Sequence, residues 1–190
     1  MNPAARLEEQ ITDGIVGEVM YPSLSMFTFA IPDAEVRDVA FQQHNDWVLD
    51  YCSVDRNRLI GIGCLPLPDV DRAIAEIDRS AGRGVRGFAI PTHVDPALPY
   101  CDPAFDPFWA RLAEAGIPFV IHGGGYPLQL PGAWMNNGQP VPQDWMGGGE
   151  NVRGKDFTVM HHAPERFVSA LVLDGVLERA AAVQRDREVG

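Results

Sequence analysis

Apolar and polar residues follow two different periods along the first part of the chain, and the two periods alternate. Continuous apolar runs predict buried strands, whereas apolar residues three and four positions apart predict helices with one buried face. The apolar runs predict strands over residues 15–21, 59–65, 85–90 and 119–122. The helical spacing predicts helices over residues 4–12, 34–51, 70–81 and 107–115. Strict alternation favours an α/β fold with a parallel sheet, which we expect to form one domain over residues 1–190.

Two of the predicted helices have a pattern that indicates their buried face. Asp33 and Asp69 are suited to cap them, because a carboxylate accepts hydrogen bonds from the free N–H groups of a first turn. In the helix over 34–51 the apolar residues at helical spacing are Val36, Val39, Ala40, Trp47 and Tyr51. In the helix over 70–81 the buried face should hold Val70, Ala73, Ile74, Ile77 and Ala81, with Asp71, Arg72, Glu76 and Arg79 facing water.

Glycine and proline residues predict where elements meet and end. Gly61 and Gly63 lie on the same side of their strand, which lets a helix approach closely. Asp106-Pro107 is expected to cap the helix that follows it. A last helix is expected over 156–179, with Pro164 as its kink or its true start, and the tail that follows it has no periodicity.

Composition and charge exclude several classes of partner. The chain has 15 basic and 26 acidic residues, a formal charge of -11, which makes nucleic acids and anionic membranes poor partners. The cysteines Cys52, Cys64 and Cys101 form no CxxC pair, and we expect reduced thiols, two of them in the core. No apolar run approaches the ~20 residues of a membrane span, and the amino terminus lacks a signal-peptide core. We therefore expect a cytoplasmic protein.

Histidines at the carboxyl ends of two predicted strands are the candidate chemical groups. His122 ends the fourth strand and is followed by three glycines, and His93 follows the third strand. Ligands bind at this end of parallel sheets, so His122 is either a metal ligand or general base, or a histidine that caps its strand by hydrogen bonding. His93 either faces the same pocket or belongs to a loop. His161 and His162 are adjacent on a helix and are expected on its surface, and His44 is expected to be a packed helix residue.

Seven short motifs, in this order, resemble the amidohydrolase-related family, in the branch typified by aminocarboxymuconate-semialdehyde decarboxylase, aromatic-acid decarboxylases and lactone hydrolases. The resemblance covers about residues 6–179, and 180–190 diverges. The motifs are Tyr21-Pro22-Ser23, Asn45-Asp46-Trp47, Arg58-Leu59-Ile60-Gly61, Leu65-Pro66-Leu67-Pro68-Asp69, Asp106-Pro107-Phe108-Trp109, Ile121-His122-Gly123 and Gly175-Val176-Leu177-Glu178-Arg179.

The resemblance implies a fold, a metal and a substrate class. Members are TIM-type (β/α)8 barrels with a divalent metal, zinc or manganese, at the carboxyl ends of the strands. The four strands here would be the second to the fifth, and His122 a metal ligand. The substrate would be a small-molecule carboxylate, such as a carboxylated aromatic or a muconate-like compound, or else a lactone. His93, Trp134 and Trp145 would form its wall, and Arg153 would clamp its carboxylate.

The resemblance also implies that the chain is truncated at both ends, because the ligand motifs of the family's other strands have no match here. A catalytic divalent metal needs about three protein ligands. Two functions therefore stay open. The chain is either a metal-dependent hydrolase or decarboxylase that lacks most of its metal site, or an inactive fragment, with or without metal, that acts only as a structural or interaction piece. A partial barrel leaves one sheet face bare, so we expect the chain to self-associate.

Overall fold

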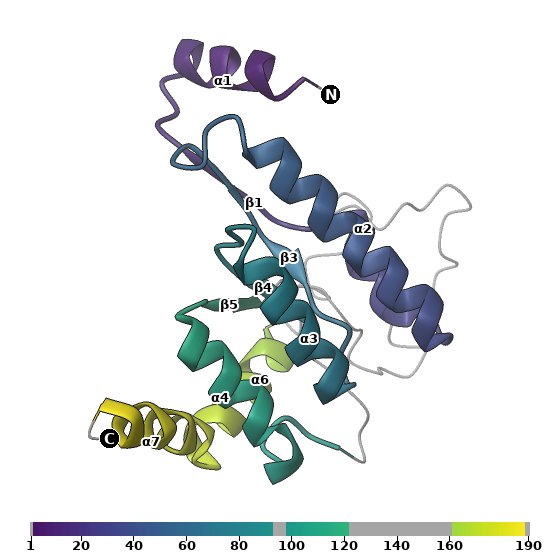
Figure 1. Cartoon of the computed structure of the whole chain (residues 1–190), viewed down its shortest axis with the longest axis vertical. Helices are drawn as coiled ribbons and strands as arrows, with labels where there is room; N and C mark the ends of the chain where they lie inside the picture. The colour runs from purple at the N-terminus through teal and green to yellow at the C-terminus, as the bar shows by residue number, and fades with distance from the viewer. Residues whose placement is uncertain (1, 93–97, 122–160, 189–190) are drawn as a thin grey trace, which may run out of the picture.

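The computed structural model describes residues 2–92, 98–121 and 161–188. Helices and strands alternate from α1 to β5, and two helices follow (Figure 1). The elements are α1 (Pro3–Thr12), β1 (Glu18–Met20), the 3-10 helix η1 (Leu24–Ala30), α2 (Ala34–Cys52), β2 (Leu59–Gly61), β3 (Gly63–Cys64), α3 (Val70–Ala81), β4 (Phe88–Ile90), the 3-10 helix η2 (Pro103–Phe105), α4 (Asp106–Ala115), β5 (Phe119–Ile121), α6 (His162–Leu173) and α7 (Val176–Glu188).

The strands pair in parallel and in chain order, as the alternation predicts. β1 pairs with β2, and β3, β4 and β5 form a second sheet in that order. Only Ile62 separates β2 from β3, so the predicted strand over 59–65 is present as two short pieces. The Ile62 N–H donates to the Met20 carbonyl over 3.1 Å, which extends the pairing with β1. In Figure 1 the strands descend through the molecule from β1 to β5, with α1 at one end and α7 at the other.

An aromatic cluster fills the core where η2, α4, β5 and α6 meet. Tyr100 contacts Phe105, Trp109 and Phe167, with ring centroids 5.1–5.9 Å apart, and Phe119 contacts both Trp109 and Phe167. Aromatic pairs in such tilted and edge-to-face geometry contribute beyond the area that they bury. Phe105 of η2 and the α4 residues Trp109 and Leu112 are all buried in this core.

The buried face of α2 differs from the predicted one. Val36, Val39 and Trp47 are 51–57% exposed, whereas the buried side chains are those of Phe41, Asn45, Val48, Leu49, Tyr51 and Cys52. Of the predicted face only Tyr51 is buried. The glycines opposite explain the choice: a Cβ on Gly61 would lie 2.9 Å from a Val48 methyl, and one on Gly63 would lie 3.0 Å from Asn45 Oδ1. The close approach expected at these two glycines therefore selects the Asn45–Val48 face of α2.

Two of the three predicted aspartate caps, Asp33 and Asp69, are confirmed. Asn2 caps α1, Asp33 accepts from the N–H groups of Glu35 and Val36, and Asp69 accepts from that of Arg72. The Asp106 cap is wrong, because Asp106 is already the first residue of α4. Its carboxylate instead accepts from Arg179 Nε at 2.9 Å.

The carboxyl-terminal part differs in two ways. The expected single helix is two helices, α6 and α7, which break at Asp174-Gly175, where Gly175 has φ +74°. Pro164 lies in the first turn of α6, so it marks the start of a helix and not a kink. The tail, in which the sequence shows no periodicity, forms most of α7, up to Glu188. None of the helices that the structure describes is both long and apolar enough to cross a membrane.

Candidate functional site

The carboxyl ends of β4 and β5 form the edge at which the sequence places its chemistry. Ile90 and Ile121 end these strands and are direct partners in the parallel register. The chain beyond Ile90 is fixed at Pro91, whose carbonyl accepts the Tyr100 hydroxyl at 2.9 Å. Burial raises the pKa of the Tyr100 phenol well above its ordinary value, so this hydroxyl keeps its proton and remains a donor.

All five residues that the sequence assigns to metal or substrate lie outside the described residues. They are His93, His122, Trp134, Trp145 and Arg153. His122 directly follows Ile121 in the sequence, and His93 follows Ile90 by three residues.

The two histidines that are adjacent in the sequence are surface residues, as predicted. His161 and His162 are both exposed at the start of α6, and their rings lie 4.5 Å apart by centroid. His161 lies 3.6 Å from Glu165, one turn further along the helix. Across residues 2–92, 98–121 and 161–188, no group of three or more His, Cys, Asp or Glu side chains could hold a metal ion. The described residues alone therefore do not supply a catalytic metal site.

A buried polar network that the sequence does not predict joins α2, β3 and α3. Glu76, assigned to the water-facing side of α3, is only 3% exposed. Its carboxylate accepts from Asn45 Nδ2 at 2.6 Å, from Ser80 Oγ at 2.8 Å and from Arg79 at 2.7 Å. Asn45 also pairs with the backbone of Cys64, donating to its carbonyl at 2.9 Å and accepting from its N–H at 2.7 Å. These bonds satisfy a buried carboxylate that would otherwise be costly to desolvate.

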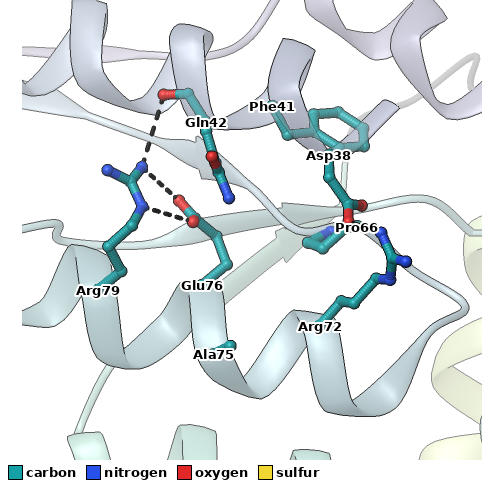
Figure 2. Close-up of a pocket in the computed structure, with 8 residues that line it drawn as sticks. All are labelled: Asp38, Phe41, Gln42, Pro66, Arg72, Ala75, Glu76 and Arg79. Carbon is teal, nitrogen blue, oxygen red and sulfur yellow. Dashed lines mark hydrogen bonds and ion pairs between the residues drawn. The ribbon is translucent and has the colours of Figure 1, made fainter. Parts of the chain in front are cut away.

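A cavity of about 160 Å³ lies beside this network, between α2 and α3. Figure 2 shows Arg79 bonded to Glu76 and to the Gln42 carbonyl on one side, and Asp38 near Arg72 on the other. Arg72 forms an ion pair with Asp38, while the second oxygen of Asp38 is buried without a hydrogen-bond partner among the described residues. The walls are helical side chains and Pro66, so this cavity belongs to the packing of the outer helices.

A second unpredicted contact pairs Ser25 of η1 with His44 of α2. Ser25 Oγ lies 2.8 Å from His44 Nδ1, and His44 Nε2 lies 3.4 Å from the Ile62 carbonyl oxygen. His44 is a partly buried helix residue, as expected, but its polar contacts are not foreseeable. Ser25 and His44 are 19 residues apart with no motif between them, so no signal in the sequence joins them.

Several residues of the seven motifs hold the fold together. Asn45 connects α2 to β3 and α3, as described above. Arg58 reaches the carbonyls of Ile15 and Val16 ahead of β1, at 3.2 and 3.1 Å. Arg179 binds Asp106 and, at 3.1 Å, the Cys101 carbonyl, so two motifs distant in sequence meet between α4 and α7. These motifs therefore indicate a fold shared with the family that they resemble, more than a chemistry shared with it.

Comparison with known proteins identifies that fold. The sequence model of the amidohydrolase family matches residues 15–184. The gamma-resorcylate decarboxylase of Rhodococcus jostii strain RHA1 is 32% identical over 102 residues, which are 49% of this chain and 31% of that protein. The chain thus spans about a third of the length of the curated relatives that it matches.

Solved structures give the same result. A structure of 2,6-dihydroxybenzoate decarboxylase complexed with 2,6-dihydroxybenzoate superposes with a TM-score of 0.67 at 22% identity, over 93% of this chain and 52% of that one. A 5-carboxyvanillate decarboxylase of Novosphingobium aromaticivorans with bound manganese superposes with a TM-score of 0.55 at 25% identity, over 63% of this chain and 34% of that one. The described strands and helices accordingly form part of a (β/α)8 barrel, as predicted, and the family match over most of its length makes this chain a member of the amidohydrolase family.

Proposed function

We propose that this chain carries part of the active site of a decarboxylase that acts on a carboxylated aromatic compound. The observation that carries the proposal is the sequence similarity to gamma-resorcylate decarboxylase, which is 32% identical to this chain over 102 residues. The superposed structures named above are also of decarboxylases. Between the two reactions that the sequence leaves open, these relatives favour decarboxylation over hydrolysis.

The paired ends of β4 and β5 support the placing of the site. Chemistry in (β/α)8 barrels takes place at the carboxyl ends of the strands. We assign His122 as one ligand of a divalent metal, with its remaining ligands outside the strands described above. The metal, manganese or zinc, would polarise an oxygen of the substrate. We assign Arg153 as the group that binds the substrate carboxylate, and His93, Trp134 and Trp145 as its wall.

The isolated chain is expected to bind metal weakly and to show no turnover, because one strand-end histidine does not complete a site of about three ligands. Metal content after dialysis against a chelator, and release of CO2 from 2,6-dihydroxybenzoate with added Mn²⁺ or Zn²⁺, measure both. Stoichiometric metal that resists the chelator would contradict this expectation. Turnover that is lost in His122→Ala but kept in His161→Ala, a control at an exposed histidine, would contradict it as well.

A chimera tests the decarboxylase assignment itself. Residues 15–184 of this chain would replace the equivalent segment of the Rhodococcus jostii enzyme, which supplies the remaining strands. We expect the chimera to release CO2 from 2,6-dihydroxybenzoate, and His122→Ala to lower the rate by roughly 100-fold or more. His161→Ala should leave the rate unchanged. A folded chimera that binds manganese and releases no CO2 would show that the assignment is wrong.

A further inference from the structure

Ser25 and His44 are arranged so that the histidine can accept the proton of the serine. The Ile62 carbonyl can only accept a hydrogen bond, so the His44 nitrogen that faces it, Nε2, carries the hydrogen. In this tautomer Nδ1 has a free lone pair. The Ser25 hydroxyl, 2.8 Å away, must therefore be the donor to Nδ1. A nucleophile, a base within hydrogen-bond reach and a third group that orients the base are the parts of an activated hydroxyl.

The surroundings keep His44 able to act as a base. Burial lowers the pKa of its imidazole below the ordinary value, and the bond to the Ile62 carbonyl opposes this shift more weakly. The imidazole is therefore neutral near pH 7. Ser25 is only partly buried, and the labelling experiment below measures whether small reagents reach its hydroxyl.

The pair also lies on the side of the sheet where parallel strands end. Ser25 belongs to η1, which follows the carboxyl end of β1, and loops at this end of parallel strands are where ligands bind. Trp47 lies beside the pair on α2: its ring centroid is 6.3 Å from that of His44, and the residue is 51% exposed. A half-exposed indole offers an apolar wall for an aromatic or other apolar group.

We propose that Ser25 is a nucleophile activated by His44, and that it accepts the acyl group of small esters with an apolar acyl part. Ser25 Oγ forms a bond to the ester carbonyl carbon while its proton passes to His44 Nδ1. The bond to the alcohol oxygen then breaks, and the departing alcohol takes the proton from Nδ1. Water attacks the acyl-serine in the same way, which releases the carboxylic acid and restores the hydroxyl. This activity needs no metal and is independent of the decarboxylase assignment.

A fluorophosphonate probe tests the nucleophile in the unaltered chain. It bonds covalently to activated serines, and peptide mass spectrometry locates the adduct. Ser23 is the matched control: it lies two residues away and is exposed, but its side chain makes no cap hydrogen bond to η1. We expect labelling of Ser25 at least ~100-fold faster than that of Ser23, the low end of the range that a general base contributes. Labelling that follows exposure, with Ser23 modified first, would overturn the proposal.

Two variants separate activation from accessibility. We expect Ser25→Ala to abolish labelling at this position and to remove hydrolysis of 4-nitrophenyl benzoate. His44→Gln keeps a polar side chain but no base, and it should slow labelling of Ser25 by ~100-fold. Circular dichroism and thermal unfolding establish that each variant is folded. A folded His44→Gln chain that is labelled at the original rate would refute the role of His44, whereas the comparison of Ser25 with Ser23 needs no variant at all.

Discussion

At the scale of single residues, the buried carboxylate of Glu76 contributes strongly to the stability of the folded chain. Its carboxylate is 3% exposed and accepts hydrogen bonds from three side chains. Removing one partner of a buried ion pair typically costs 3–5 kcal/mol, but Arg79 is partly exposed and keeps Asp46, so the low end applies. We expect Glu76→Ala to lower the free energy of unfolding by ~3 kcal/mol, measured by urea denaturation.

Two control variants accompany this prediction: one keeps the shape of the side chain at position 76, and the other removes a glutamate at an exposed position. Glu76→Gln retains an oxygen that can accept from Asn45 and Ser80 but loses the charge, so its loss should be smaller than that of Glu76→Ala. Glu8→Ala removes an exposed glutamate and should change the free energy of unfolding by less than ~0.5 kcal/mol. Equal losses in Glu76→Ala and Glu8→Ala would mean that Glu76 faces water after all.

His44 predicts a dependence of stability on pH. Burial lowers the pKa of its imidazole below the ordinary 6.5 in the folded state, so the unfolded chain binds the proton more readily. The stabilisation is complete above pH 6.5 and is lost as the pH falls below it. The slope should be at most ~1.4 kcal/mol per pH unit. Urea denaturation between about pH 8 and pH 5 should show this slope, and His44→Gln should flatten it. The same slope in His44→Gln as in the unaltered chain would contradict the assignment, and His161→Gln is the exposed control.

At the scale of elements, the sequence predicts which segments form helices better than which faces they bury. The helix over 34–51 has apolar residues on more than one side, and the Val36–Val39–Trp47 stripe fits helical spacing as well as the stripe that is buried. The choice is made by Gly61 and Gly63 on the neighbouring strands, a contact that the spacing within one helix does not contain. For the same reason the spacing assigns Glu76 to the water-facing side of α3, because its partner Asn45 belongs to another helix.

The sequence pattern does not predict the end of α7, for a different reason. Residues 180–188 lack an apolar period, but alanine, glutamate, glutamine and arginine have high intrinsic helix propensity. Periodicity reports burial and not propensity, so it does not predict a helix whose apolar residues follow no period. For the candidate metal and substrate residues, the sequence places His93 and His122 after two parallel strands. The register of β4 and β5 confirms that those two strands are adjacent.

The close contact of β2 with α2 gives a prediction at this scale. A Cβ on Gly61 would lie 2.9 Å from Val48 Cγ2 and 3.2 Å from Cys52 Sγ, so Gly61→Ala must displace α2. Overpacking of this kind typically costs 1–3 kcal/mol. We expect Gly61→Ala to lower the thermal midpoint, and Gly82→Ala to leave it unchanged or raise it. Gly82 has nothing within 4 Å of its Cβ position and has φ -64°. A lower midpoint in Gly82→Ala than in Gly61→Ala would show that close packing is not what requires Gly61.

At the scale of the whole molecule, the outer strands differ from the inner ones. β4 is fully buried, whereas every residue of β5 is partly exposed and Val19 of β1 is 44% exposed. Among the described residues, β1 pairs only with β2, and β5 pairs only with β4. Strand edges that lack partners and carry apolar side chains invite pairing with another chain. Val36, Val39 and Trp47 on α2 are further exposed apolar residues.

We therefore expect the isolated chain to self-associate, which size-exclusion chromatography with light scattering measures. A lysine on an edge strand blocks strand pairing, because its charge would have to be desolvated. Val19→Lys should shift the chain toward the monomer if association uses β1. Val54→Lys is the matched control, since Val54 is 49% exposed but lies in the turn after α2, and it should leave the distribution unchanged. A compact monomer that binds no hydrophobic dye would show that these apolar edges are covered within a single chain.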